Sequence, residues 1–153
     1  MVDLTCKELE KLQQERRINI LKIHGISKDG KIIGKGSNHV LANNDPTAHA
    51  EVLVISEYCK KTKKVYLKDY ILISSTEPCV MCSGAIKWAK IGQIYYSVPQ
   101  QELNRISGGK QKPSCESLIN SGFSQKHIVG NILLDEGLKV YDDFKFTQQD
   151  ERK

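Results

Sequence analysis

The stretch TEPCVMC, residues 76–82, decides the fold together with an earlier one, DPTAHAEV, residues 45–52. The two stretches contain one histidine and two cysteines, which supply the nitrogen and sulfur ligands that zinc prefers in proteins. A catalytic zinc site keeps one of its four positions open for water, so three protein ligands are enough. We therefore predict that His49, Cys79 and Cys82 hold one zinc ion per chain.

The residues after each stretch indicate how the fold brings these ligands together. The chain after His49 is apolar enough for a buried helix, residues 71–73 are typical of a strand, and residues 85–91 favour a second helix. A right-handed helix–strand–helix succession lays both helices side by side, in the same direction, on one face of a sheet. Their N-termini therefore meet, and the positive helix ends favour the thiolates that zinc requires.

Glu51 lies two positions after His49, roughly 200° around a helix, so it is poorly placed to bind the same metal from the same side. A carboxylate at that position is better suited to carry protons. We predict that Glu51 is the catalytic acid and base.

Each short pattern has a simpler explanation when it stands alone. A single His-x-Glu is common, and a single Cys-x-x-Cys is more often half of a structural zinc knuckle or a redox motif. The chain has no second Cys-x-x-Cys and no second histidine three to five residues from His49. A structural site with four ligands cannot be built from the usual spacings, so the joint pattern favours catalysis.

The two stretches, extended to NNDPTAHAEV (residues 43–52) and TEPCVMCSGAI (residues 76–86), resemble the cytidine deaminase-like superfamily. They are most similar to its purine branch, which contains bacterial guanine deaminases and tRNA-specific adenosine deaminases. The likeness covers roughly residues 30–98. It implies an α/β fold in which zinc-bound water attacks an aminated ring, Glu51 moves the protons and ammonia leaves.

The resemblance also implies substrate contacts. Asn38 matches the position at which the purine branch uses an asparagine to hydrogen-bond the base, although a turn residue is the simpler interpretation, and Ala50 is assigned to the same site. His24 stands where the branch usually has Pro-x-Gly-Ala, and it could enter the pocket or be satisfied locally. Guanine deaminases use an acidic residue and an aromatic residue from their C-terminal part. The candidates here are Tyr141, Asp142, Asp143 and Phe144.

A small aminated purine, either guanine or a purine nucleoside, is the favoured substrate, with adenosine in tRNA as the alternative. An RNA substrate requires phosphate contacts and stacked bases, but the net charge is only +5 and aromatic residues make up 7%. Residues 97–101, SVPQQ, also lack the glycine- and alanine-rich region of the tRNA enzymes. A pyrimidine substrate is more distant. A module that kept zinc and lost its chemistry is disfavoured by the presence of Glu51.

Assembly and location follow from the same comparison and from composition. The purine branch implies a homodimer, and a tail that exposes Tyr141, Phe144 and Phe146 would be better buried against a partner. No apolar run approaches the roughly 18 residues of a membrane span, and the N-terminus lacks the pattern of a signal peptide. The odd number of cysteines, five, fits a reducing compartment. We expect a cytoplasmic protein without membrane contact.

The remaining pattern predicts a three-layer α/β/α sandwich with a mixed five-stranded sheet. Residues 1–153 form a single domain, with a catalytic core over about 18–98 and a variable C-terminal part over 99–153. The expected strands are 18–26, 32–36, 70–74, 94–98 and 127–134, the first two joined by a hairpin at the Asp29-Gly30 pair. In addition to the two helices that carry the ligands, the expected helices are 5–17, 101–107 and 114–119, and residues 37–46 are a loop.

Overall fold

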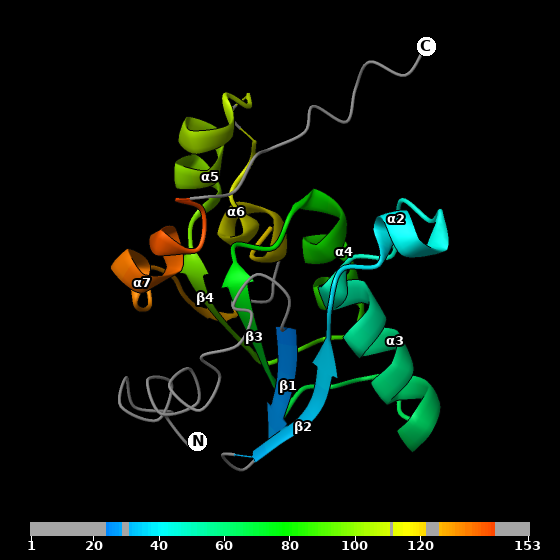
Figure 1. Ribbon diagram of the computed structural model, residues 1–153. Coiled ribbons are helices and arrows are strands. Elements are labelled where there is room, and N and C mark those ends of the chain that lie inside the picture. The colour runs from blue at the N-terminus through cyan, green and yellow to red at the C-terminus, as the bar shows by residue number, and fades with distance from the viewer. Residues whose placement is uncertain (1–23, 29–30, 111, 122–125, 143–153) are drawn as a thin grey trace.

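The computed structural model describes residues 24–28, 31–110, 112–121 and 126–142 (Figure 1). The elements follow one another as β1 (His24–Lys28), β2 (Lys31–Gly36), α2 (Val40–Asn43), α3 (Ala50–Thr62), β3 (Ile71–Thr76), α4 (Val80–Trp88), β4 (Gln93–Val98), α5 (Gln100–Ser107), α6 (Cys115–Ile119), β5 (His127–Val129) and α7 (Leu134–Lys139). The expected opening helix over residues 5–17 and the expected start of the first strand lie outside the described residues.

The strands form one mixed sheet of five, in the order β2-β1-β3-β4-β5. β1 is antiparallel to both of its neighbours, whereas β3, β4 and β5 are parallel to one another. Lys28 pairs with Lys31 across the predicted hairpin, which forms one edge of the sheet. The mixed five-stranded sheet expected from the sequence is confirmed.

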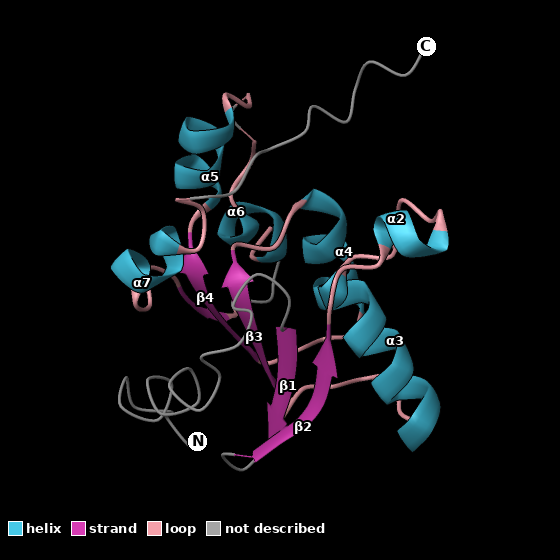
Figure 2. Cartoon of the chain, viewed as in Figure 1, coloured by secondary structure: helices cyan, strands magenta, loops and turns pink. Residues whose placement is uncertain are grey.

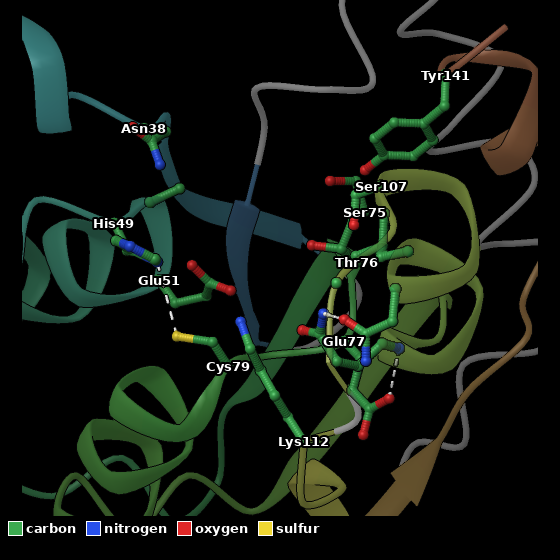
Figure 3. Close-up of a pocket in the computed structure, with 15 residues that line it drawn as sticks. Asn38, His49, Glu51, Ser75, Thr76, Glu77, Cys79, Ser107, Lys112 and Tyr141 are labelled. Carbon is green, nitrogen blue, oxygen red and sulfur yellow. Dashed lines mark hydrogen bonds between the residues drawn. The ribbon is translucent and has the colours of Figure 1, made fainter. Parts of the chain in front are cut away.

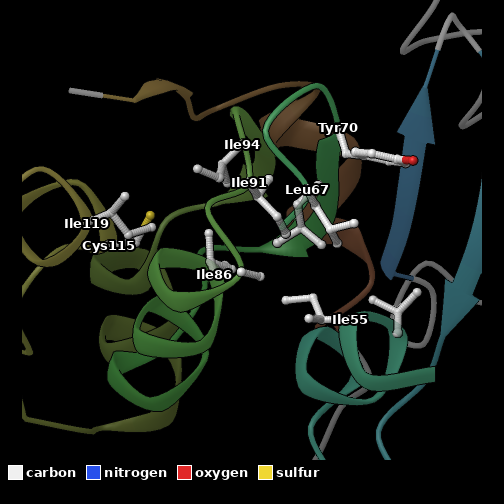
Figure 4. Close-up of a cluster of buried hydrophobic side chains, with 11 residues drawn as sticks. Ile55, Leu67, Tyr70, Ile86, Ile91, Ile94, Cys115 and Ile119 are labelled. Carbon is white, nitrogen blue, oxygen red and sulfur yellow. The ribbon is translucent and has the colours of Figure 1, made fainter. Parts of the chain in front are cut away.

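One face of the sheet is covered by α3, α4 and α6, which share a buried core with β3 and β4 (Figure 4). Leu72 of β3 and Ile94 of β4 point into this core, and Ile86 of α4 packs against them. Alternate residues of a strand face opposite sides of a sheet, so the intervening residues must be buried elsewhere. The core members are Val54, Ile55, Leu67, Tyr70, Leu72, Ile86, Ala89, Ile91, Ile94, Cys115 and Ile119.

The intervening residues Ile71 and Tyr95 pack on the other face against Ile132, just before α7. α7 contacts β4 on this side, and a side chain at Gly137 would collide with Ser97. The sheet therefore has α3, α4 and α6 on one face and α7 on the other, as expected for an α/β/α sandwich (Figure 2).

The start of α3 is held close to the end of β2. A Cβ atom at Gly36 would lie 2.5 Å from the carbonyl oxygen of Ala50 and 3.1 Å from Cβ of Val54. Glycine is needed at this position because the backbones approach so closely. The end of β2 therefore packs directly against the first turns of α3, which begins at Ala50.

Two of the sequence-based assignments were wrong. The loop expected over 37–46 contains the short helix α2, where the Asn38 side-chain oxygen accepts a hydrogen bond from the N–H of Val40 at 3.0 Å. The strand expected over 127–134 ends at Val129, and α7, which was not expected, follows. Asn131 and Leu133 have φ angles of 61° and 49°, a left-handed backbone that cannot continue a strand.

Within the described part of the chain, none of the helices combines the length and apolar character that a membrane span requires.

Replacing Leu72 by alanine tests the core. The side chain is 0% exposed in the central strand, so its truncation should lower the free energy of unfolding by about 2–5 kcal/mol. Val65→Ala is the matched control, because Val65 is 70% exposed and should change the stability by less than about 0.5 kcal/mol. Urea unfolding of both variants measures the difference. Equal effects would contradict the assigned core.

Candidate metal centre and active site

Three side chains that are far apart in sequence meet at the starts of α3 and α4. The ligand atoms of His49, Cys79 and Cys82 all lie within 4.8 Å of one another. Cys79 Sγ is 3.7 Å from His49 Nδ1, the contact drawn as a dashed line in Figure 3. His49 is the N-cap of α3, Cys79 is the N-cap of α4, and Cys82 is buried in the first turn of α4. The predicted meeting of the two helix N-termini is confirmed.

The pKa values of the two cysteine thiols are shifted in opposite directions. Hydrogen bonds from Cys82 and then His49 lower the pKa of Cys79 to about 4, so Cys79 is a thiolate at neutral pH. The same hydrogen bond with Cys79, together with burial, raises the pKa of Cys82 well above its usual range. The hydrogen bond with Cys79 also raises the pKa of His49. A metal ion must therefore displace a proton from Cys82, which makes its affinity fall as the pH falls.

This ligand group fits zinc. Tetrahedral coordination with Zn–S near 2.3 Å and Zn–N near 2.0–2.1 Å places ligand atoms roughly 3.3–3.8 Å apart. The Cys79–His49 distance of 3.7 Å already lies in that range, and the whole group needs only a small contraction. Among the described residues the group has three members, the number of protein ligands that is typical of catalytic zinc sites, in which water takes the fourth position.

The chain enters α3 through a tight turn at Asp45. Its side-chain oxygen accepts hydrogen bonds from the Thr47 backbone N–H at 2.8 Å and from the Thr47 hydroxyl at 2.7 Å. The N–H of His39 donates to the carbonyl of Ala48 at 2.9 Å, which closes the loop in front of the helix. The Asp-Pro-Thr-Ala segment thus turns the chain so that His49 caps α3.

Glu51 lies in the first turn of α3 and is 5% exposed. Its charge contributes to the raised pKa of the Cys82 thiol, so the carboxylate lies beside the ligand group. Glu51 also lines the cavity into which the group opens. A buried carboxylate between a metal group and a cavity is suitably placed to exchange protons with a bound molecule.

The cavity has a volume of about 410 Å³, within the usual range for sites that bind small molecules. Asn38 and Ala50 line it near the metal group, and Tyr141 lines it from the C-terminal part (Figure 3). Tyr141 is half-buried, and this burial raises the pKa of its hydroxyl to about 12, so the side chain is neutral at neutral pH.

Other sequence-based candidates fall elsewhere. Asp142 is exposed and is not among the residues that line the cavity. Asp143 and Phe144 lie outside the described residues, and of His24 only the backbone is described, at the start of β1. Their roles, and the substrate contacts of Asn38 and Ala50, stay predictions.

Most of one cavity wall was missed by sequence reasoning. α5 and the segment after it carry mostly polar residues, and no local pattern links them to a site. Glu77 lies inside the metal-binding motif, but the sequence suggested no role for it. The missed lining residues are Ser75, Thr76, Glu77, Gln100, Leu103, Asn104, Ser107, Gly109 and Lys112.

Residues 23–98 match the family model described as the cytidine and deoxycytidylate deaminase zinc-binding region. A tRNA-specific adenosine deaminase from Agrobacterium fabrum is 33% identical over 102 residues, which are 63% of this chain and 67% of that protein. The chain belongs to the cytidine deaminase-like family of zinc-dependent deaminases. Within this family it is also similar to a guanine deaminase from Bacillus subtilis, at 51% identity over 72 residues.

That last match covers 47% of this chain and 46% of the Bacillus protein, so the chain spans about half the length of this curated relative. A solved structure of guanine deaminase from Nitrosomonas europaea has a TM-score of 0.73 at 19% identity and covers 92% of this chain and 84% of the other. At this identity the likeness supports the fold alone. The fold expected from the sequence is thereby confirmed.

Metal content tests the ligand assignment. Protein purified without added zinc should contain close to one zinc per chain, and Cys82→Ser should lose most of it, because zinc prefers a thiolate to a hydroxyl. Cys59→Ser is the matched control, since Cys59 lies in α3 outside the group and should keep the full zinc content. Equal zinc in both variants would contradict the assignment.

Proposed function

We propose that this protein is a zinc-dependent hydrolytic deaminase of a small aminated purine, either guanine or a purine nucleoside. The observation that carries the proposal is the buried Glu51 carboxylate beside the His49, Cys79 and Cys82 group, at the wall of one cavity. Zinc held by these three ligands would supply Lewis-acid activation of water. The remaining chemistry is proton transfer.

Glu51 is the group that moves the protons. Its carboxylate accepts a proton from the attacking water and delivers it to the adjacent ring nitrogen, while the new C–O bond forms. Glu51 then transfers the second proton of the former water molecule to the amino group. The C–N bond breaks, the carbonyl forms and ammonia leaves. The overall reaction exchanges an exocyclic amine and water for a carbonyl and ammonia.

The remaining cavity residues would hold the ring. Asn38 uses its side-chain oxygen for the N–H of Val40, which leaves its amide N–H groups to donate to a ring acceptor. Ala50 is small, so it allows a flat ring to approach the metal group. Tyr141, from the C-terminal part of the chain, would provide an aromatic ring against which the purine can pack.

The guanine deaminase of Bacillus subtilis supports the purine base as substrate, at 51% identity over the matched core. A tRNA-specific adenosine deaminase from Aquifex aeolicus is 43% identical over 84 residues and supports the alternative. The modest charge of +5 and the small cavity favour the small molecule. The expected cytoplasmic location stays a prediction.

Glu51→Gln tests the proton-transfer role. The amide keeps the size of the side chain but cannot accept the proton, so turnover should fall at least about 10²-fold while zinc content and folding stay unchanged. Glu57→Gln, an exposed carboxylate on the same helix, should keep full activity. Ammonia release measures both. If Glu51→Gln retained more than about a tenth of the activity, the assigned role would be wrong.

A side-by-side assay tests the substrate. Guanine, guanosine, adenosine, cytidine and an anticodon stem-loop are incubated with zinc-loaded protein at two salt concentrations. We expect turnover of guanine or a purine nucleoside with little dependence on salt, because few phosphate contacts are involved. Turnover of the stem-loop alone, falling steeply with salt, would establish the tRNA alternative. No ammonia from any substrate would favour the non-catalytic module.

The homodimer is part of the proposal, but its support differs from the sequence-based argument. Tyr141 lines the cavity, so it is not evidence for a surface that binds a partner. Phe144 and Phe146 lie outside the described residues. The outer face of α4 is the better candidate. Val80 and Trp88 are exposed there and share one helix face with Gly84, where a side chain would meet open space.

Light scattering tests the dimer. The mass in solution should be twice that of one chain, and Trp88→Glu should shift it towards the monomer, because Trp88 is 84% exposed and the charge would be buried between the copies. Tyr66→Glu is the control, as an aromatic exposed at the loop between α3 and β3. A dimer that survives Trp88→Glu would place the interface elsewhere.

A further inference from the structure

Glu77 lies between the segment that carries Cys79 and the part of the cavity wall that α5 forms. It follows the last residue of β3, precedes Pro78 and Cys79, and is 6% exposed. Its backbone N–H donates to the carbonyl of Val98 at 2.8 Å, which extends the pairing of β3 with β4. The position of the backbone of Glu77 is therefore fixed by the sheet.

Each oxygen of the Glu77 carboxylate accepts a hydrogen bond from a different helix. Oε2 accepts from the N–H of Gln100 at 2.8 Å, and Oε1 accepts from the N–H of Cys115 at 2.7 Å. These are the first residues of α5 and α6, whose N–H groups have no partner within their own helices. Charge-assisted bonds of this kind are stronger than neutral ones, and the helix dipole favours a negative charge at both positions.

α5 has less other support than α6. None of its residues is buried, and its N-cap, Pro99, makes no side-chain hydrogen bond. α6, in contrast, buries Cys115 and Ile119 and is capped by Ser114. The charge-assisted hydrogen bond from the Gln100 N–H to the Glu77 carboxylate therefore helps to hold the start of α5 beside the sheet.

The anchored elements form part of the cavity wall. α5 contributes four lining residues, and the segment between α5 and α6 contributes Gly109 and Lys112 (Figure 3). The first residue of each helix is bonded to Glu77, so one side chain holds both helices that flank this segment. The lining residues of α5 are Gln100, Leu103, Asn104 and Ser107.

We propose that Glu77 is a positioning residue, which sets how far the wall made by α5, Gly109 and Lys112 stands from the metal ligands and so how tightly the cavity holds its purine. The inference rests on the proposed function. Both oxygens of Glu77 are engaged by backbone N–H groups, so the proton transfers remain with Glu51. A displaced wall weakens binding, because the contacts that the lining residues make with the purine depend on their distance from it.

Glu77→Gln tests this. The amide keeps the length of the side chain but turns one acceptor oxygen into an NH₂ donor that faces an N–H group. In the Glu51→Gln background, which blocks turnover, the affinity for guanine should fall about tenfold or more with zinc content unchanged. With Glu51 intact, KM should rise about tenfold and kcat should change less than about threefold. Glu116→Gln, an exposed carboxylate in α6, is the matched control and should change neither quantity.

Amide hydrogen exchange gives a readout that does not depend on activity. The N–H groups of Gln100 and Cys115 should be protected in the wild type and should exchange about tenfold faster in Glu77→Gln. If that variant fails to fold, Glu77→Asp, which keeps the charge but is one methylene shorter, should show an intermediate loss of affinity and protection.

Three results would overturn the inference: unchanged guanine affinity in Glu77→Gln, a fall in kcat with unchanged KM, or loss of zinc. The first would leave only a role in stability, the second would indicate proton transfer, and the third would place the effect at the metal. Failure of the proposed function is distinguishable. Wild-type protein that binds guanine without releasing ammonia contradicts the reaction alone, whereas wild-type protein that binds none of the tested purines contradicts both.

Discussion

The constraint on which the site depends is that two helices must begin at the same point in space. α3 and α4 start beside each other because each packs on the same face of the sheet and shares one core. His49 and Cys79 are the residues that cap these two helices, and Cys82 lies in the first turn of α4. The metal ligands are therefore placed by the backbone of the fold. Any change that separates the two helix starts would separate the ligands, even if no ligand were altered.

Much of this part of the fold could be predicted from the sequence, because its signals are local. The apolar run after His49, the strand around Leu72 and the Cys-x-x-Cys spacing each carry a pattern that a single sequence displays. The parallel packing of the two helices follows from the handedness of the crossover, so the meeting of the ligands could also be inferred.

The part of the cavity wall that α5 forms could not be predicted from the sequence, for physical reasons. α5 is polar and has no buried residue, so its sequence gives no sign that it faces a cavity. The two hydrogen bonds of Glu77 join residues 23 and 38 positions apart, and contacts at that separation leave no local pattern. The end of β5 was placed too late because Asn131 and Leu133 adopt a left-handed backbone that is uncommon for residues other than glycine. Tyr141 was expected both in the pocket and at a partner surface, and the structure places it at the pocket.

Together these elements give the cavity two sides with different tasks. The side built from α3 and α4 holds the predicted metal ligands and Glu51, which would perform the proposed chemistry, and we propose that the side built from α5 sets how tightly the ring is bound. The central claim is that the metal site is open, with three protein ligands. X-ray absorption at the zinc edge tests it most directly. The account predicts two sulfurs near 2.3 Å, one imidazole nitrogen near 2.0–2.1 Å and one light atom that is not part of an imidazole. A third sulfur or a second imidazole would show a closed structural site and would contradict the account.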